Sequence, residues 1–295
     1  MTGTSRQAPA EAQGPHAPAA PGYAPRRTLP LRTEAIRQLR RRRTLVMALL
    51  LAGLPCVVAA AFAVGGAPDG SEDATLIRGA TASAANFAVA CLFLSTGFLL
   101  AVPVALFFGD TVASEASWSS LRYLLAAPVP RGRLLAAKFA VALAFSAVGL
   151  ALLPLTALGL GAVLYGWGPL ELPTGGTLPA TEAAGRLAAV TAYVLAGHLV
   201  TAALAFWLST VTDAPLGAVG GALGLTIVGS ILDAITALGD WRDFLPAHWS
   251  YAWADAFQPR PEWTGMLQGT SVSLSYALVL GALAVRRFRA KDIVS

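Results

Sequence analysis

Charged residues are scarce in this sequence. Only 13% of the 295 residues are Asp, Glu, Lys or Arg, whereas 56% are hydrophobic, and a soluble globular domain carries about 25% charged residues. This balance excludes a disordered chain and argues against a water-soluble fold. Because one membrane-spanning helix needs about 20 apolar residues, the hydrophobic residues are numerous enough for several spans.

Lysine is the rarer cation: the 21 basic residues are 19 Arg, Lys138 and Lys291. A phosphate-binding P-loop needs Gly before its Lys and Ser or Thr after it, whereas the two triplets here are Ala-Lys-Phe and Ala-Lys-Asp. The sequence therefore carries no P-loop ATPase site. Cys56 and Cys91 have neither metal-type nor redox-type spacing, and we expect both to be small buried apolar residues.

Six uncharged stretches are long enough to cross a membrane. They cover residues 44–64, 82–108, 139–165, 187–212, 216–232 and 266–285. The sequence therefore predicts an all-α polytopic integral membrane protein, with a six-span transmembrane domain over residues 31–295. Residues 1–30 are rich in Pro and Ala without apolar periodicity, and we expect a disordered tail there.

The distribution of Lys and Arg predicts the orientation, because cytoplasmic loops are enriched in both. With the N-terminus inside, the cytoplasmic segments are residues 1–43, 109–138, a turn near Asp213, and 286–295. They hold 17 of the 21 basic residues. We therefore expect both termini in the cytoplasm. The basic balance reflects membrane topology and does not indicate nucleic-acid binding, which needs a solvated basic domain.

A basic stretch at residues 31–43 precedes the first span. On a helix, Ala35, Ile36 and Leu39 would share one face, with arginines opposite. Two interpretations remain open: a helix lying among lipid headgroups, or positive charge that simply orients the first span.

Residues 109–133 form the longest predicted cytoplasmic loop. Asp110 is suited to cap the start of a helix, and Pro128 is suited to end it. Between them an apolar stripe recurs at helical spacing; it consists of Trp118, Leu121 and Leu125. Such a helix either rests on lipid or offers its face to a protein partner.

This loop resembles the first cytoplasmic loop of type-2 ABC transporter permeases, the membrane subunits of ATP-binding-cassette exporters. The matching residues are Glu115, Leu121, Arg122, Leu124, Leu125, Pro128, Val129, Arg131 and Lys138. Ser119 and Ser120 stand where the family usually has Gly-Thr. The basic C-terminal run 286–292, which ends in Asp, is also similar to the tail of the family.

The resemblance implies that residues 110–133 are a coupling element that docks on a separate P-loop ATPase subunit, beside a helix at 31–43. The implied coupling residues are Asp110, Glu115, Trp118, Leu121, Arg122, Leu125, Pro128 and Arg131. ATP and Mg²⁺ would bind the ATPase partner, and no cofactor would bind this chain. Two copies, or this chain and a second permease, would enclose the path in the plasma membrane of a bacterium and move a substrate by alternating access.

The predicted outer segment at 236–264 holds four of the seven tryptophans. Because Trp and Tyr favour the membrane interface, one interpretation is a belt of short helices lying at the headgroups. The resemblance implies another, a re-entrant gate above the export path, with Asp240, Arg242 and Asp243 facing water.

Two ionisable residues lie at predicted membrane depth, His198 near the middle of the fourth span and Asp233 close to the outer end of the fifth. Intramembrane ionisable residues are candidates for a transport path. The fifth span also carries small-residue spacings that favour close helix packing; its glycines are Gly217, Gly220, Gly221 and Gly224.

Two alternatives remain from other classes. A proton-coupled secondary transporter would be expected to place several acids at the membrane midplane, where this chain has only His198 and the peripheral Asp233. A membrane scaffold without transport activity, or a membrane-embedded enzyme, is compatible with the composition, although no catalytic constellation is recognisable. The sequence does not identify the substrate.

Overall fold

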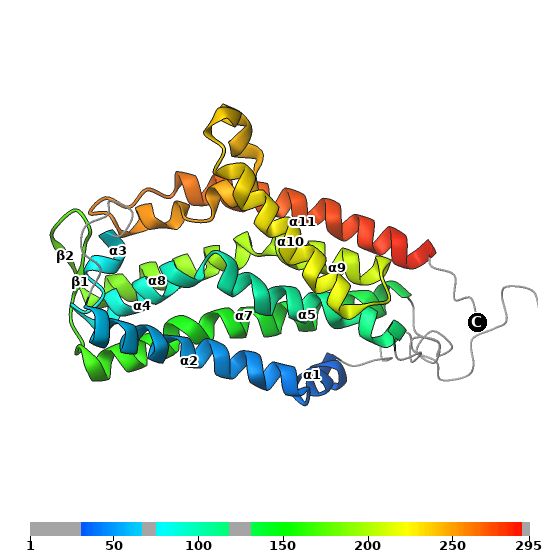
Figure 1. The fold of residues 1–295 in the computed structure, drawn as a ribbon, viewed down its shortest axis with the longest axis horizontal. Helices are drawn as coiled ribbons and strands as arrows, with labels where there is room; N and C mark the ends of the chain where they lie inside the picture. Colours follow the sequence, from blue (N-terminus) through cyan, green and yellow to red (C-terminus); the bar gives the residue numbers. More distant parts are fainter. Residues whose placement is uncertain (1–30, 67–74, 118–130, 291–295) are drawn as a thin grey trace, which may run out of the picture.

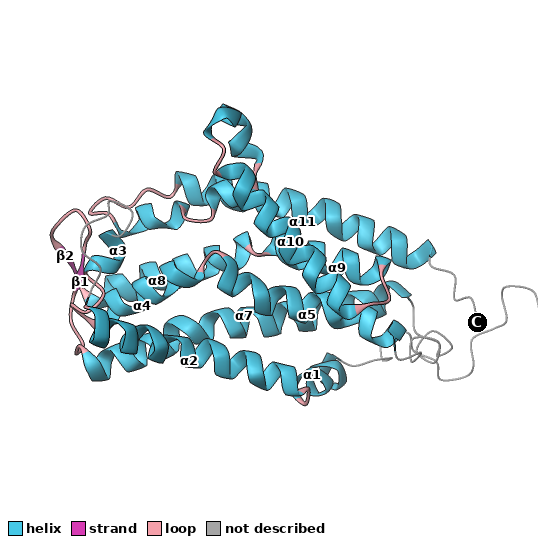
Figure 2. Ribbon diagram, viewed as in Figure 1, coloured by secondary structure: helices cyan, strands magenta, loops and turns pink. Residues whose placement is uncertain are grey.

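The computed structural model describes residues 31–66, 75–117 and 131–290, which form a bundle of long helices (Figures 1 and 2). The elements are α1 (Leu31–Leu39), α2 (Arg42–Gly65), α3 (Thr75–Arg78), α4 (Ala84–Ser95), α5 (Phe98–Ser117), α7 (Arg131–Leu164), β1 (Leu170–Glu171), β2 (Thr177–Leu178), α8 (Ala180–Gly197), α9 (Leu199–Val211), α10 (Pro215–Asp233), η3 (Thr236–Phe244), η4 (Pro246–Trp249), η5 (Ala252–Phe257) and α11 (Thr264–Ala290). The two short strands pair antiparallel. The predicted all-α class is confirmed.

Six helical segments of the described chain are long and apolar enough to span a membrane, which confirms the predicted number. They are Arg42–Gly65, Phe98–Glu115, Gly132–Leu164, Ala180–Val211, Pro215–Asp233 and Thr264–Ala290. The third begins several residues before the predicted stretch, because the helix continues through Arg133 and Lys138 at its N-terminal end.

The second predicted span, residues 82–108, is not one continuous helix. The chain breaks at Thr96–Gly97 into the short α4 and the longer α5. Ser95 and Thr96 donate their hydroxyls to the carbonyls of Cys91 and Leu92, at 2.6 and 2.7 Å. Such bonds to the preceding turn bend helices, and a glycine beside them favours a kink.

The fourth span is also divided, at His198 between α8 and α9. Both divided spans run along the length of the bundle (Figure 1). α9 contacts α5, α10 and α11, while α7 contacts α2, α4 and α5. α1, the start of α7 and the end of α11 lie at the same end of the molecule. The described parts of the segments predicted to be cytoplasmic therefore gather at one end of the bundle, which we call the basic end.

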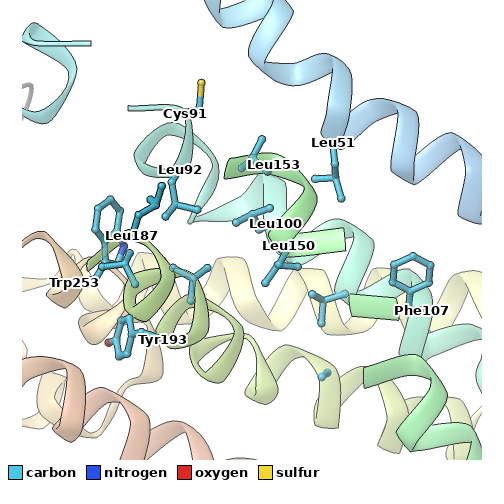
Figure 3. Close-up of a cluster of buried hydrophobic side chains, with 14 of the residues drawn as sticks. Leu51, Cys91, Leu92, Leu100, Phe107, Leu150, Leu153, Leu187, Tyr193 and Trp253 are labelled. Carbon is cyan, nitrogen blue, oxygen red and sulfur yellow. The ribbon is translucent and has the colours of Figure 1, made fainter. Parts of the chain in front are cut away.

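The core lies where α4, α5, α7 and α8 meet, and Figure 3 shows part of it. Leu92, Leu100, Leu150 and Leu153 are almost completely buried there. Nearer the basic end, three aromatic rings connect α5, α7 and α9. The ring centroid of Phe139 lies 5.1 Å from that of Phe108 and 5.2 Å from that of Phe206. Aromatic pairs at these distances stabilise packing beyond the area they bury.

Cys91 is buried, but Cys56 is exposed on the surface of α2. The expectation of two buried cysteines is therefore wrong for Cys56. Of the most apolar 18-residue stretch of α2, 22% is buried within this chain. An apolar helix whose surface is mostly uncovered is suited to face lipid.

The basic helix α1 places its polar side against the bundle. Glu34 and Gln38 are buried, whereas Leu31, Ile36 and Leu39 are exposed. This arrangement is the reverse of a soluble amphipathic helix and suits a helix whose apolar side meets lipid.

The glycines of α10 do not pack the bundle as a group. An added Cβ at Gly221 would contact Leu208 of α9 at 3.0 Å, whereas at Gly220 and Gly224 it would meet no described atom within 4 Å. At Gly217 it would meet only the preceding turn of the same chain. Within the described part of this chain, Ala218, Val219 and Ala222 form the buried face of α10 instead. Close helix packing at these three glycines stays a prediction.

The close approach of α5 to α10 occurs at a different glycine. A Cβ on Gly109 would lie 2.8 Å from Val219 Cγ2 and 3.2 Å from its backbone nitrogen.

We expect Gly109→Ala to lower the free energy of unfolding by about 1–3 kcal/mol through overpacking. The matched change Gly220→Ala should be neutral or stabilising, since Ala favours the helix by about 1 kcal/mol over Gly. Thermal unfolding of the purified variants measures both effects, and equal midpoints would contradict the close approach.

The aromatic segment between α10 and α11 folds as three short 3₁₀ helices, η3, η4 and η5. Its two halves differ in burial. Trp241 and Phe244 on η3 are exposed, whereas Trp253 and Phe257 on η5 are completely buried. η4 contacts both α10 and α11. Only part of the segment is therefore available as an interfacial belt, and the rest belongs to the packed bundle.

Candidate functional site

Four charged side chains from three helices meet at the basic end, and we call them the ionic cluster: Glu34 and Arg37 of α1, Glu115 of α5 and Lys138 of α7. Lys138 Nζ donates to Glu115 Oε1 at 2.6 Å and to Glu34 Oε1 at 3.1 Å. Arg37 Nη1 lies 3.1 Å from Glu115 Oε1 and 3.4 Å from Glu34 Oε2. Glu34, Glu115 and Lys138 are 7%, 5% and 2% exposed, so water screens these pairs poorly.

A second ion pair lies next to this cluster on α5. Asp110 is buried and pairs with Arg41 and Arg43. These arginines lie at the junction of α1 and α2, since Arg41 is the residue before α2 begins. Together the two sets of ion pairs attach α1 and the start of α2 to α5 and α7.

The prediction that Asp110 caps a helix is wrong. α5 continues from Phe98 to Ser117, so Asp110 lies in its interior. The carboxylates of Asp110 and Glu115 can lie buried within α5 because basic side chains pair with them. Arg41 and Arg43 pair with Asp110, and Lys138 pairs with Glu115. Buried charges are tolerated when they are paired and hydrogen-bonded.

The other predicted coupling residues fall mostly outside the described chain. Those not described are Trp118, Leu121, Arg122, Leu125 and Pro128. Arg131 is the first residue of α7. The ionic cluster nevertheless fixes the helices on both sides of that segment, since Glu115 lies near the end of α5 and Lys138 near the start of α7. The coupling role of all eight residues stays a prediction.

A large cavity lies beside the two helix breaks, at Thr96–Gly97 and at His198. Its volume is about 810 Å³, within the range of ligand-binding pockets, and its walls come from the α4–α5 break, α8, α9, α10, η4 and α11. Leu204, Ile231 and Leu280 contribute apolar surface, whereas Tyr193, Thr201 and Thr226 contribute hydroxyls.

His198 lies in the wall of this cavity, at the break between α8 and α9. Its Nδ1 lies 2.8 Å from the carbonyl oxygen of Val194, and the ring also meets the backbone of Gly97 at the α4–α5 break. Gly97 in turn lies close to the Tyr251 hydroxyl. The histidine predicted as a transport-path residue therefore joins the two broken spans beside the cavity.

Asp233, the second predicted path residue, lies at the end of α10 beside the cavity rim. Its Oδ1 is 2.8 Å from His248 Nδ1 and 3.2 Å from Arg242 Nε. These contacts connect α10 to η3 and η4, and residues of η4 line the cavity. Asp233 therefore links α10 to the helix η4, whose residues line the cavity.

Arg186 is a buried basic residue that anchors the other half of the aromatic segment. Its Nη1 donates to the carbonyls of Ala256 and Gln258 at 2.8 and 2.6 Å, and Nη2 pairs with Glu182 at 2.6 Å. The guanidinium thus connects α8 to the end of η5.

Removing this anchor should loosen the segment. We expect Arg186→Met to lower the free energy of unfolding by about 2–3 kcal/mol, because charge-assisted hydrogen bonds to two carbonyls are lost. Limited proteolysis between Ala252 and Glu262 should become faster. Arg260→Met is the matched control, because Arg260 is exposed in the same segment. Equal proteolysis rates for the two variants would show that Arg186 is not an anchor.

Sequence reasoning missed several of these residues for identifiable reasons. Glu34 is 104 positions from Lys138, and no local sequence pattern predicts a pair so far apart. The cavity hydroxyls had a weak signal, since Thr201, Thr226 and Tyr193 interrupt apolar stretches. Polar residues within spans are the ones to examine first.

Comparison with known proteins identifies the family. The model of the ABC-2 family transporter protein matches residues 31–245, which is more than two thirds of the chain. The comparison with curated proteins found no match. The matched region includes the ionic cluster, both divided spans and the start of the aromatic segment, and it agrees with the resemblance found in the loop residues. The chain belongs to the ABC-2 transporter family.

Proposed function

We propose that this chain is the permease half of an ATP-driven exporter and that a separate P-loop ATPase subunit supplies the energy. Family membership together with six apolar helices makes the chain the membrane component of a transporter and not itself an enzyme. The proposal adds the ATPase partner, the direction of transport and the coupling route.

The observation that carries the proposal is the ionic cluster. It joins the helices on both sides of residues 118–130 to each other and to α1. A force applied to that segment by a partner reaches α5 and α7 as a unit, because breaking a buried ion pair costs about 3–5 kcal/mol. This arrangement supports a coupling element more directly than a loop that rests on lipid.

In the proposed mechanism, closure of an ATPase dimer moves residues 110–133, and the attached spans tilt to open the cavity outward. Hydrolysis and its Mg²⁺ belong to the partner. Two copies of this chain, or this chain with a related permease, flank the path. Both termini face the cytoplasm, and the membrane is the plasma membrane of a bacterium.

The test is copurification from the native membrane. Affinity purification of the tagged chain in mild detergent should retain a soluble protein with a P-loop, identified by mass spectrometry. Encoding of that protein in the adjacent reading frame would add independent support. Recovery of the chain without any ATPase, from membranes in which it transports substrate, would disprove the proposed energy source.

A further inference from the structure

The cavity beside His198 lacks charge. Among the lining side chains that the structure describes, none belongs to Asp, Glu, Lys or Arg. The carboxylate at the rim, Asp233, is already paired with Arg242 and His248. An ion inside such a cavity would leave water without a counter-charge, which is costly at membrane depth. The cavity therefore selects against charged molecules.

His198 does not change this conclusion. Its Nδ1 already contacts the Val194 carbonyl, and no lining carboxylate is present to balance an imidazolium. The neutral ring, with its proton on Nδ1, satisfies that carbonyl without burying a charge.

Three of the hydroxyls that line the cavity have used their protons inside the protein. Thr226 donates to the Ala222 carbonyl at 2.9 Å, and its oxygen lies 3.2 Å from Thr201 Oγ1, which is thus the donor of that pair. The Tyr193 hydroxyl donates to the Trp249 carbonyl. Since each hydroxyl has one donor and two acceptor lone pairs, these three oxygens have acceptor capacity left and no donor to offer.

We propose that this cavity binds an uncharged, mostly apolar molecule that carries hydrogen-bond donors, such as hydroxyl or amide N–H groups. The apolar walls bury the body of the ligand, and the oxygens of Tyr193, Thr201 and Thr226 receive its donors. As the substrate class of the exporter, this inference rests on the proposed function, although binding itself requires neither ATP nor a partner.

Three probes separate the effects of hydrogen-bond donors, apolar skeleton and charge on binding. Bisphenol A is uncharged and has two phenol donors, its dimethyl ether keeps the skeleton without donors, and tetraphenylphosphonium is a bulky cation. Equilibrium dialysis against the full chain in lipid nanodiscs, with empty nanodiscs subtracted, should give saturable binding of bisphenol A. Each missing hydrogen bond is worth about 1 kcal/mol, so the ether should bind about tenfold or more weakly. The cation should show no saturable binding.

The variant Thr201→Val with Thr226→Val removes two acceptors at nearly constant volume. It should weaken bisphenol A about tenfold and leave the weak binding of the ether unchanged. Thr191→Val is the matched control, because Thr191 bonds within α8 to the Leu187 carbonyl and does not line the cavity.

The proposal is overturned if no probe binds saturably, if the ether or the cation binds as tightly as bisphenol A, or if the double variant matches the control. It is also overturned if chemically cross-linked dimers bind no probe, because a second copy then fills the cavity. All of these binding measurements omit the ATPase and nucleotide. A negative binding result therefore does not affect the copurification test, and a negative copurification result does not affect the binding measurements.

Discussion

Replacing Lys138 with Met should destabilise the protein by about 3–5 kcal/mol, the cost of breaking a buried ion pair by removing one partner. Lys138 is 2% exposed and is the cation that contacts both Glu34 and Glu115 at 3.1 Å or less. Its loss removes one cation from two buried carboxylates, which keep their ion pairs with Arg37. In detergent, the midpoint of thermal unfolding should fall by about 10 °C, measured by tryptophan fluorescence.

Two controls separate charge from packing. The triple variant Glu34→Gln, Glu115→Gln, Lys138→Met removes both acids together with the buried base, and it should recover most of the lost stability because no buried charge is left unpaired. Arg37, which loses both acids in this variant, is exposed to water. Arg287→Met, at an exposed position near the end of α11, should shift the midpoint by less than about 2 °C, because surface ion pairs contribute about 0–1 kcal/mol. A triple variant as unstable as Lys138→Met would mean that lost side-chain volume, and not charge, is responsible.

The second large effect concerns docking of the ATPase. Trp118→Ala, Leu121→Ala and Leu125→Ala together should reduce copurification of the ATPase at least tenfold, since central apolar anchors each contribute about 2 kcal/mol or more to an interface. The yield and thermal midpoint of the permease should stay at their wild-type values. Quantitative immunoblotting of the purified complex measures the ratio of the two subunits.

Trp167→Ala is the matched control for this experiment. Trp167 is 67% exposed and precedes β1 by three residues. The strands lie at the opposite end of the bundle from α1 (Figure 1), so the loss of Trp167 should leave the subunit ratio unchanged. A charge reversal at Glu115 is a poorer probe of docking, because it breaks the ionic cluster. If the triple alanine variant retains the ATPase in full, residues 110–133 are not the docking element.

The number of spans was predictable because long uncharged stretches have few alternatives in a membrane. Their interruptions were harder to predict, because the stretch from 82 to 108 is uncharged throughout its length. The signals for the first break were Gly97 and the two residues before it, Ser95 and Thr96, whose hydroxyls bond back to the preceding turn. Composition alone could not distinguish such a break from a helix that continues.

The candidate site was predictable in part. His198 stood out as an ionisable residue in a span, and the structure places it in the cavity wall. The ionic cluster was not predictable, because it pairs residues that are 23 and 104 positions apart. Gly109 was missed for a similar reason: its neighbour Val219 lies on another helix, whereas the glycine spacing in α10 was visible along the sequence but is mostly uncovered in this chain.

The two interpretations of residues 110–133, docking on an ATPase or resting on lipid, are separated most directly by photo-crosslinking in native membranes. A photoreactive phenylalanine analogue is placed at Leu121 or Leu125, with Trp167 as the control position. The account predicts that both loop positions crosslink to a P-loop ATPase and that the control position does not. Crosslinks from the loop to lipid alone, with the ATPase present in the same membranes, would contradict it.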